Sequence, residues 1–77
     1  MIFLRMCKVN LLVELGKEIS KIRKSKNLSQ ESLADKCSLH RTYIGCVERG
    51  ERNITIKSLH KICLALGISI REIFENK

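Results

Sequence analysis

The 77-residue chain has no proline and no tryptophan, and only one tyrosine, two phenylalanines and four glycines. A β-sandwich or β-barrel normally uses more aromatic residues and more turn residues than this. Their scarcity therefore favours helices. The hydrophobic share of 44% is enough for a packed core, and the length allows one small domain. A domain of this size buries only roughly 60% of the surface that its unfolded chain exposes, so a partner subunit would stabilise it.

Long apolar runs are also missing. A membrane-spanning helix needs roughly 18 apolar residues in a row, and no segment reaches that length. The apolar start of the chain is interrupted by Arg5 and Lys8, and no small-residue cleavage site follows, which argues against a secretory signal. We expect residues 1–10 to form an N-terminal arm or a helix extension.

The chain lacks the spacing signatures of metal and disulfide sites. Its four cysteines stand 30, 9 and 17 positions apart, without a C-x-x-C pair or clustered histidines, at Cys7, Cys37, Cys46 and Cys63. We expect free thiols in a reducing cytoplasm, and neither a metal nor another cofactor. Because a Ser-His-acid set and a glycine-rich phosphate loop are missing too, the sequence does not indicate an enzyme.

Positive charge is what the chain has in excess. Fifteen lysines and arginines outnumber eight acidic residues and give a net charge of +7. This excess points to an anionic partner, with nucleic acid as the first candidate and a membrane surface as the second.

Apolar residues recur at helical spacing along the chain. The first stripe predicts a helix over residues 11–26 and consists of Leu12, Leu15, Ile19 and Ile22. Gly16 lies within this helix, and a close contact with another helix would explain it. Ser29 is a good N-cap for a second helix over residues 29–37, whose buried face would be Leu33, Ala34 and Cys37.

A third helix is predicted over residues 41–49, after a turn at Ser38-Leu39-His40. Ile44, Val47 and Glu48 share one of its faces, and Gly50 ends it. Thr55 would cap a fourth helix that stops at Gly67, with a buried stripe of Ile56, Leu59, Ile62, Cys63 and Leu66. A capping box from Ser69 to Glu72 opens a short fifth helix, with Ile73 and Phe74 inward. The expected fold is all-α, with five helices in one bundle.

Two short helices joined by a three-residue turn have the form of a helix-turn-helix. If Ile44 and Val47 face the core, the rotation of 100° per residue turns the opposite side of the third helix outward. That side carries Thr42, Gly45, Cys46 and Arg49, flanked by Arg41 and Tyr43. Arginine can bond guanine through two N–H groups, and Thr or Tyr can contact thymine methyls or phosphates, so this side suits a DNA major groove.

At this point the residues amount to a resemblance. Residues 15–74 resemble the Xre-type helix-turn-helix family of small phage repressors and Cro proteins, which implies a five-helix lambda-repressor-like domain. The matching pieces are Leu15-Gly16-Lys17, Ile22-Arg23, Leu28-Ser29-Gln30-Glu31, Leu33-Ala34, Ile44, Glu48-Arg49-Gly50 and Ala65-Leu66-Gly67-Ile68. A narrower similarity is to the controller proteins of restriction-modification systems, carried by Arg41-Thr42-Tyr43-Ile44, Val47-Glu48-Arg49 and the segment from Arg52 to Leu59.

The resemblance implies a role for each matching position. Gln30 would clamp a phosphate, Arg41 and Thr42 would read bases with Tyr43 beside them, and Arg52 and Asn53 would reach the DNA from the following loop. With the outward Cys46 and Arg49, the expected DNA-binding residues are Gln30, Arg41, Thr42, Tyr43, Cys46, Arg49, Arg52 and Asn53. Glu48 lies on an inward face and needs a partner, and Arg23 is the cation that the resemblance pairs with it.

The resemblance also implies a two-fold dimer joined through the C-terminal helices. Leu64 lies off the stripe of its helix, and apolar residues crowd the last one, so part of this surface should need cover. The expected interface consists of Leu64, Ile68, Ile70, Ile73 and Phe74. Residues 11–77 would then form one DNA-binding and dimerisation domain that regulates transcription at a near-palindromic operator, with no membrane or small-molecule partner.

The chain departs from the family pattern in three places. Ser38 stands where glycine is usual, so the turn should avoid a strongly positive φ or accept strain. His40 replaces a better N-cap, so Ser38 or water would cap the third helix instead. Cys46 stands at a position often held by a polar reader. The competing interpretation is an antitoxin-like or adaptor module of the same fold, whose basic face binds an acidic protein.

Overall fold

The computed structural model describes residues 11–75, and the predicted N-terminal arm and Cys7 lie outside them. These residues form five helices and no strand: α2 (Leu11–Ser25), α3 (Gln30–Cys37), α4 (Arg41–Glu48), α5 (Ile56–Leu66) and α6 (Ile70–Glu75). The predicted all-α, five-helix fold is confirmed. Two of the predicted helices, α2 and α4, end one residue earlier than expected.

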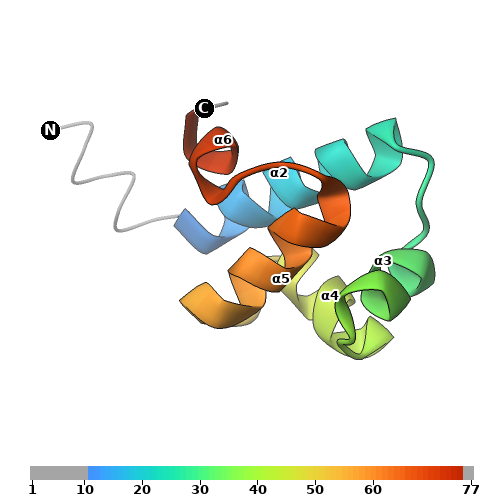
Figure 1. Cartoon of the computed structure of the whole chain (residues 1–77). Coiled ribbons are helices and arrows are strands. Elements are labelled where there is room, and N and C mark those ends of the chain that lie inside the picture. The colour runs from blue at the N-terminus through green and yellow to red at the C-terminus, as the bar shows by residue number, and fades with distance from the viewer. Residues whose placement is uncertain (1–10, 76–77) are drawn as a thin grey trace, which may run out of the picture.

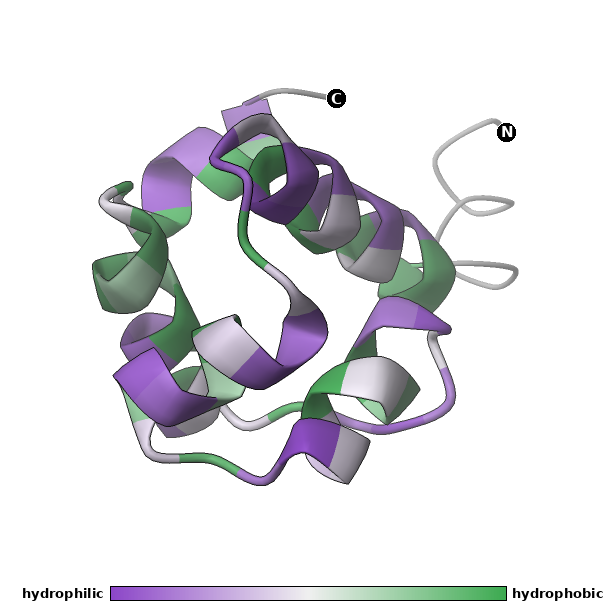
Figure 2. Cartoon of the chain, turned by 90° about the vertical axis from the view of Figure 1, so that its right-hand side faces the viewer, coloured by the Kyte–Doolittle hydropathy of each residue, from purple (hydrophilic) through white to green (hydrophobic). Residues whose placement is uncertain are grey.

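The helices enclose one core (Figure 1). In it α4 packs against α2 and α3, α3 also packs against α5, and α6 packs against α2 and α5. Apolar and polar residues alternate along the helices. In Figure 2 the apolar residues appear as green bands and the polar residues as purple bands. The buried apolar residues are Leu15, Ile19, Leu33, Ala34, Cys37, Ile44, Val47, Leu59, Ile62, Cys63, Leu66 and Ile73.

Local hydrogen bonds fix the helix ends. The Ser29 hydroxyl accepts from the backbone N–H of Ser32 at 2.9 Å, and the Thr55 hydroxyl accepts from that of Ser58 at 3.0 Å. At the start of α6, Glu72 Oε2 accepts from the Ser69 N–H at 3.2 Å while the Ser69 hydroxyl accepts from the Glu72 N–H at 3.3 Å. The caps predicted at Ser29 and Thr55 and the capping box from Ser69 to Glu72 are present.

The turn before α4 differs from expectation. His40 is itself the N-cap, because its Nδ1 accepts a hydrogen bond from the Thr42 N–H at 3.1 Å. The prediction that Ser38 or water would replace it was wrong, since an imidazole nitrogen can accept as a hydroxyl does. Ser38 adopts a left-handed φ of 57°, so the turn keeps the backbone geometry for which glycine is preferred.

Three positions face differently from what the helical period predicted. Phe74 is 45% exposed and not inward, because Ile73 is the residue of α6 that packs into the core and Phe74 lies 100° further around the helix. Ile56 is 71% exposed, because it starts α5 where no other helix lies over it, so it is not part of the buried stripe. Gly45 is buried instead of facing outward, because the Gln30 amide and the Arg49 guanidinium lie over its backbone.

Gly16 marks the closest approach of α2 and α4. A Cβ atom there would lie 2.5 Å from the carbonyl oxygens of both Val47 and Glu48. The close contact predicted from this glycine is therefore confirmed, and no residue with a side chain fits without moving the backbone.

Within residues 11–75 the cysteines are free thiols at Cys37, Cys46 and Cys63. Burial raises the pKa of the Cys63 thiol to about 11, with a smaller contribution from the charge of Glu72, and burial also raises the pKa of Cys37. No group of three potential metal ligands occurs in this part of the chain. None of the described helices combines the length and apolarity needed to cross a membrane.

Candidate nucleic-acid interface

The α3-turn-α4 unit holds α4 firmly from behind. Ala34 is buried between the helices, and its carbonyl accepts a hydrogen bond from the Leu39 N–H at 3.0 Å, which closes the turn. Leu33 on α3 and Ile44 on α4 are fully buried, and Val47 is nearly so. Because three apolar side chains fix its back, the orientation of α4 is set and its opposite side is presented to solvent.

The solvent side of α4 carries most of the residues expected there. Arg41, Thr42 and Arg49 are exposed, while Tyr43 and Cys46 are half-buried. Neither the Arg41 guanidinium nor the Thr42 hydroxyl hydrogen-bonds to another described residue. Their donors and acceptors are therefore available to a ligand.

Behind this surface, Glu48 is held by an arginine from α2. Arg23 donates from Nε to Glu48 Oε2 at 2.7 Å and from Nη2 to Oε1 at 3.1 Å, and the two side chains are only 10% and 5% exposed. Arg23 Nη1 also donates to the Leu28 carbonyl at 2.7 Å. One guanidinium thus ties together α2, the loop before α3 and the end of α4.

Gln30 joins this network, which the sequence did not indicate. Its Nε2 donates to Glu48 Oε1 at 2.9 Å, across 18 positions of sequence. Its Oε1 lies over Gly45, 3.5 Å from where a Cβ would be. The side chain expected to contact phosphate is therefore already oriented by Glu48, with its nitrogen toward the carboxylate.

Two further arginines near this surface, Arg49 and Arg52, have partners within the protein. Arg49 Nε lies 3.1 Å from Glu51 Oε1, its Nη2 approaches Cys46 Sγ at 3.6 Å, and these groups raise the pKa of Arg49. Arg52 lies in the loop after α4 with its guanidinium carbon 5.3 Å from the centre of the Tyr43 ring. Asn53, also in that loop, is exposed. The sequence anticipated neither the Glu51 partner nor the stacking on Tyr43.

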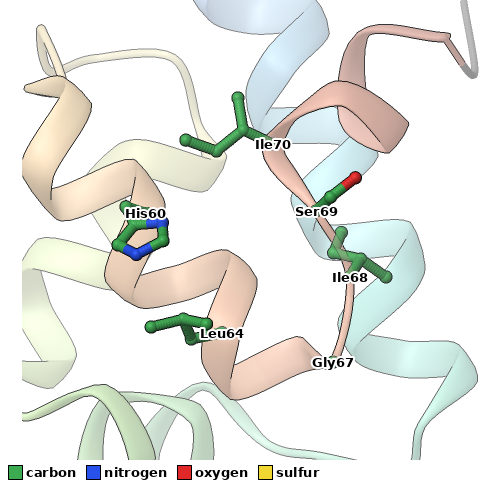
Figure 3. A pocket seen from close by; sticks show the side chains of 6 residues that line it. All are labelled: His60, Leu64, Gly67, Ile68, Ser69 and Ile70. Atoms are coloured by element: carbon green, nitrogen blue, oxygen red, sulfur yellow. The ribbon is translucent and has the colours of Figure 1, made fainter.

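The C-terminal side has an exposed apolar surface with a shallow groove. Leu64 is 65% exposed and Phe74 is also exposed, while Ile68 and Ile70 are half-buried. Figure 3 shows the groove between α5 and α6, lined by His60, Leu64, Gly67, Ile68, Ser69 and Ile70. Ile73 must be removed from the expected interface, because its side chain is fully buried in the core of its own protomer.

Comparisons with known proteins agree with this arrangement. A family model described as helix-turn-helix matches residues 19–73. Control protein C.BamHI from Bacillus amyloliquefaciens is 43% identical over 67 residues, which cover 86% of this chain and 83% of that protein.

Solved structures give the same result. The restriction-modification controller protein C.AhdI from Aeromonas hydrophila superposes with a TM-score of 0.81 at 44% identity, covering 82% of this chain and 96% of that one. The controller protein C.Esp1396I, as a tetramer in complex with its natural 35 base-pair operator, superposes with a TM-score of 0.80 at 47% identity, covering 86% of this chain and 87% of that one.

Proposed function

The chain belongs to the helix-turn-helix family and is similar to restriction-modification controller proteins, and from that premise we propose that it regulates transcription by binding operator DNA as a homodimer. The observation that carries the proposal is the two-sided environment of α4. Its apolar back is fixed in the core, while Arg41 and Thr42 on its exposed side make no side-chain hydrogen bonds within residues 11–75.

Base reading is assigned to the first turn of α4. Arg41 donates to guanine and Thr42 contacts a neighbouring base, each good contact discriminating against a wrong base by roughly 1 to 3 kcal/mol. Arg49 and Cys46 lie further along the same side. Arg49 is already paired with Glu51, so it has to exchange that partner for DNA and contributes less than Arg41.

Affinity that does not depend on sequence comes from contacts to the DNA backbone. Gln30 at the start of α3 and the exposed Asn53 in the loop after α4 contact phosphates. The net charge of +7 attracts the duplex, and lysines and arginines release its counterions. Binding therefore weakens steeply as salt is raised.

Residues 11–77 act as one DNA-binding and dimerisation domain. The exposed apolar side chains of Leu64 and Phe74, with Ile68 and Ile70, form the surface that a second copy covers. In such a dimer the two α4 helices lie about 34 Å apart, one turn of DNA, and the operator is a near-palindrome. The C.Esp1396I complex, a tetramer with its operator, supports the binding of DNA by an oligomer.

The protein works by binding and not by catalysis, and its place of action is the cytoplasm, where promoter DNA lies. Whether it represses or activates depends on where its operators lie relative to the promoter. The family is one of DNA-binding regulators, which supports a role without covalent chemistry.

A binding experiment tests the proposal. Duplexes are selected by the protein from a random-sequence pool, and affinity is measured for a selected duplex and for a scrambled duplex of equal composition. We expect Arg41→Ala to weaken binding to the selected duplex by roughly 10-fold or more, and binding to the scrambled duplex far less. Arg71→Ala on α6 removes the same charge away from α4 and serves as the matched control.

Two results of this experiment would contradict the proposed DNA recognition. If the protein shifts no duplex at low salt, or selects no sequence from the pool, DNA recognition is refuted and the adaptor interpretation takes its place. If Arg41→Ala lowered the affinity for both duplexes equally, Arg41 would not read bases, and the rest of the proposal would stand.

A further inference from the structure

Arg52 has an unusual contact for an exposed arginine. Its guanidinium carbon lies 5.3 Å from the centre of the Tyr43 ring, close enough for a cation–π interaction. Among the described residues, no carboxylate lies within ion-pair distance of it and no hydrogen bond engages it. The aromatic ring is thus the group that places this charge in a loop where an arginine would otherwise sample many rotamers.

Tyr43 is a fixed platform for this contact. It belongs to the first turns of α4, directly after Arg41 and Thr42, and is half-buried against the apolar core. Its ring therefore moves with α4 and not with the loop. A guanidinium over this ring is held next to the residues proposed to read bases, although Arg52 lies nine positions further along the chain.

The type of contact decides what Arg52 can still do. The face of an aromatic ring attracts the positive charge of a guanidinium, and this attraction does not require an oxygen acceptor for its five N–H donors. Arg49 is the opposite case, since its Nε is engaged by Glu51 and its Nη2 by Cys46. The ring contact holds Arg52 without an oxygen partner among the described residues, so its N–H donors stay available to a base edge or phosphate.

We propose that Tyr43 is a positioning residue: its ring, and not its hydroxyl, holds the Arg52 guanidinium beside the start of α4 so that Arg52 and Arg41 contact DNA as one preorganised unit. This inference rests on the proposed DNA-binding function and changes the role of Tyr43 within it. The sequence suggested a direct DNA contact by Tyr43, whereas the geometry assigns it an action through Arg52.

The first experiment uses the protein without DNA. Ring currents should shift the side-chain NMR signals of Arg52 upfield in the wild type and in Tyr43→Phe, and the shift should disappear in Tyr43→Leu. Leucine keeps an apolar group against the core, and thermal melting verifies that each variant is folded. Unshifted Arg52 signals in the wild type would overturn the proposal.

The second experiment is a double-variant cycle on the selected and scrambled duplexes. Tyr43→Phe should bind the selected duplex like the wild type, and Tyr43→Leu should bind it roughly two- to fivefold more weakly, the strength of an exposed cation–π contact. Arg52→Ala should lose more, and adding Tyr43→Leu to it should cause no further loss. Binding to the scrambled duplex should follow the charge of Arg52 and not the ring.

The outcomes separate the two proposals. An equal loss in Tyr43→Phe and Tyr43→Leu would show a direct contact by the hydroxyl and overturn the positioning role. Losses that multiply in the double variant would do the same. If the wild type does not distinguish the two duplexes at all, the proposed function is overturned and the positioning role with it.

Discussion

On α4, Glu48 and Arg41 stand at opposite ends of one short helix and meet opposite surroundings. The Glu48 carboxylate accepts three hydrogen bonds from Arg23 and Gln30, and its side chain is nearly buried. The Arg41 guanidinium is exposed and makes no hydrogen bond within the described residues. The inward carboxylate at the end of α4 is thus bonded to protein, which stabilises the fold, whereas the exposed guanidinium at the start of α4 stays available for a ligand.

The largest test of this difference is Glu48→Gln. The substitution removes the charge that compensates buried Arg23, and leaving one member of a buried pair alone costs roughly 3 to 5 kcal/mol. We expect the free energy of unfolding in urea to fall by about that amount. Arg23→Met combined with Glu48→Met should recover part of the loss, because no charge then stays buried; a double variant as unstable as Glu48→Gln would contradict the explanation.

Gly16→Ala disturbs the packing of α2 against α4 and leaves all charged residues unchanged. The new Cβ would lie 2.5 Å from two backbone oxygens of α4, so the helices must separate. We expect a loss of about 3 kcal/mol, at the upper end for overpacked sites. Thermal melting measures it, and an unchanged midpoint would show that α2 and α4 adapt without cost.

Alkaline pH should weaken the core while leaving the outer side of α4 intact. The pKa of Cys63 is raised to about 11 by burial, so the folded state keeps the thiol proton over a range in which the unfolded chain loses it. Stability is full below about pH 9 and falls by up to about 1.4 kcal/mol per unit as pH rises towards 11. Urea unfolding at pH 8 and 10.5 should show this loss, and Cys63→Ala should show less of it; an identical loss in both would exclude Cys63 as the cause.

The smallest expected effect has the opposite sign. Gly45 is helical, and a Cβ there would meet only side-chain ends, at 3.3 Å from Arg49 Nη1 and 3.5 Å from Gln30 Oε1. Because the Arg49 side chain is exposed and can shift, we expect Gly45→Ala to raise stability by about 0.5 to 1 kcal/mol through helix propensity. Gly16→Ala tests the side of α4 that packs on α2, and Gly45→Ala tests the side covered only by side-chain ends. A loss of stability in both variants would mean that these two sides of α4 are packed equally tightly.

Much of the fold was predictable because its signals are local. Ser29, Thr55 and the Ser69–Glu72 box cap helices through hydrogen bonds that span three positions. The stripe from Leu59 to Leu66 was found from its spacing and is buried. Ile56 fits the same spacing and is exposed, because periodicity shows the side of a helix but not whether another element covers its first turn.

The candidate site was predictable in its composition but not in its connections. The residues on the outer side of α4 followed from the helical period once Ile44 and Val47 were placed inward. The links from Gln30 to Glu48, from Arg49 to Glu51 and from Arg52 to Tyr43 left no mark in the sequence. The sequence predicted Ile73 both inward and in the dimer interface; its burial confirms the first prediction and removes it from the second.

By itself the sequence determined the helices, their ends, most of the core and the basic character of the chain, because capping and amphipathic spacing act between residues only a few positions apart. The tertiary structure decided which distant side chains meet and which polar groups stay available. Those contacts depend on the distances and angles between whole helices, and shifts of an ångström that no residue pattern encodes determine whether a hydrogen bond or a stacked pair can form.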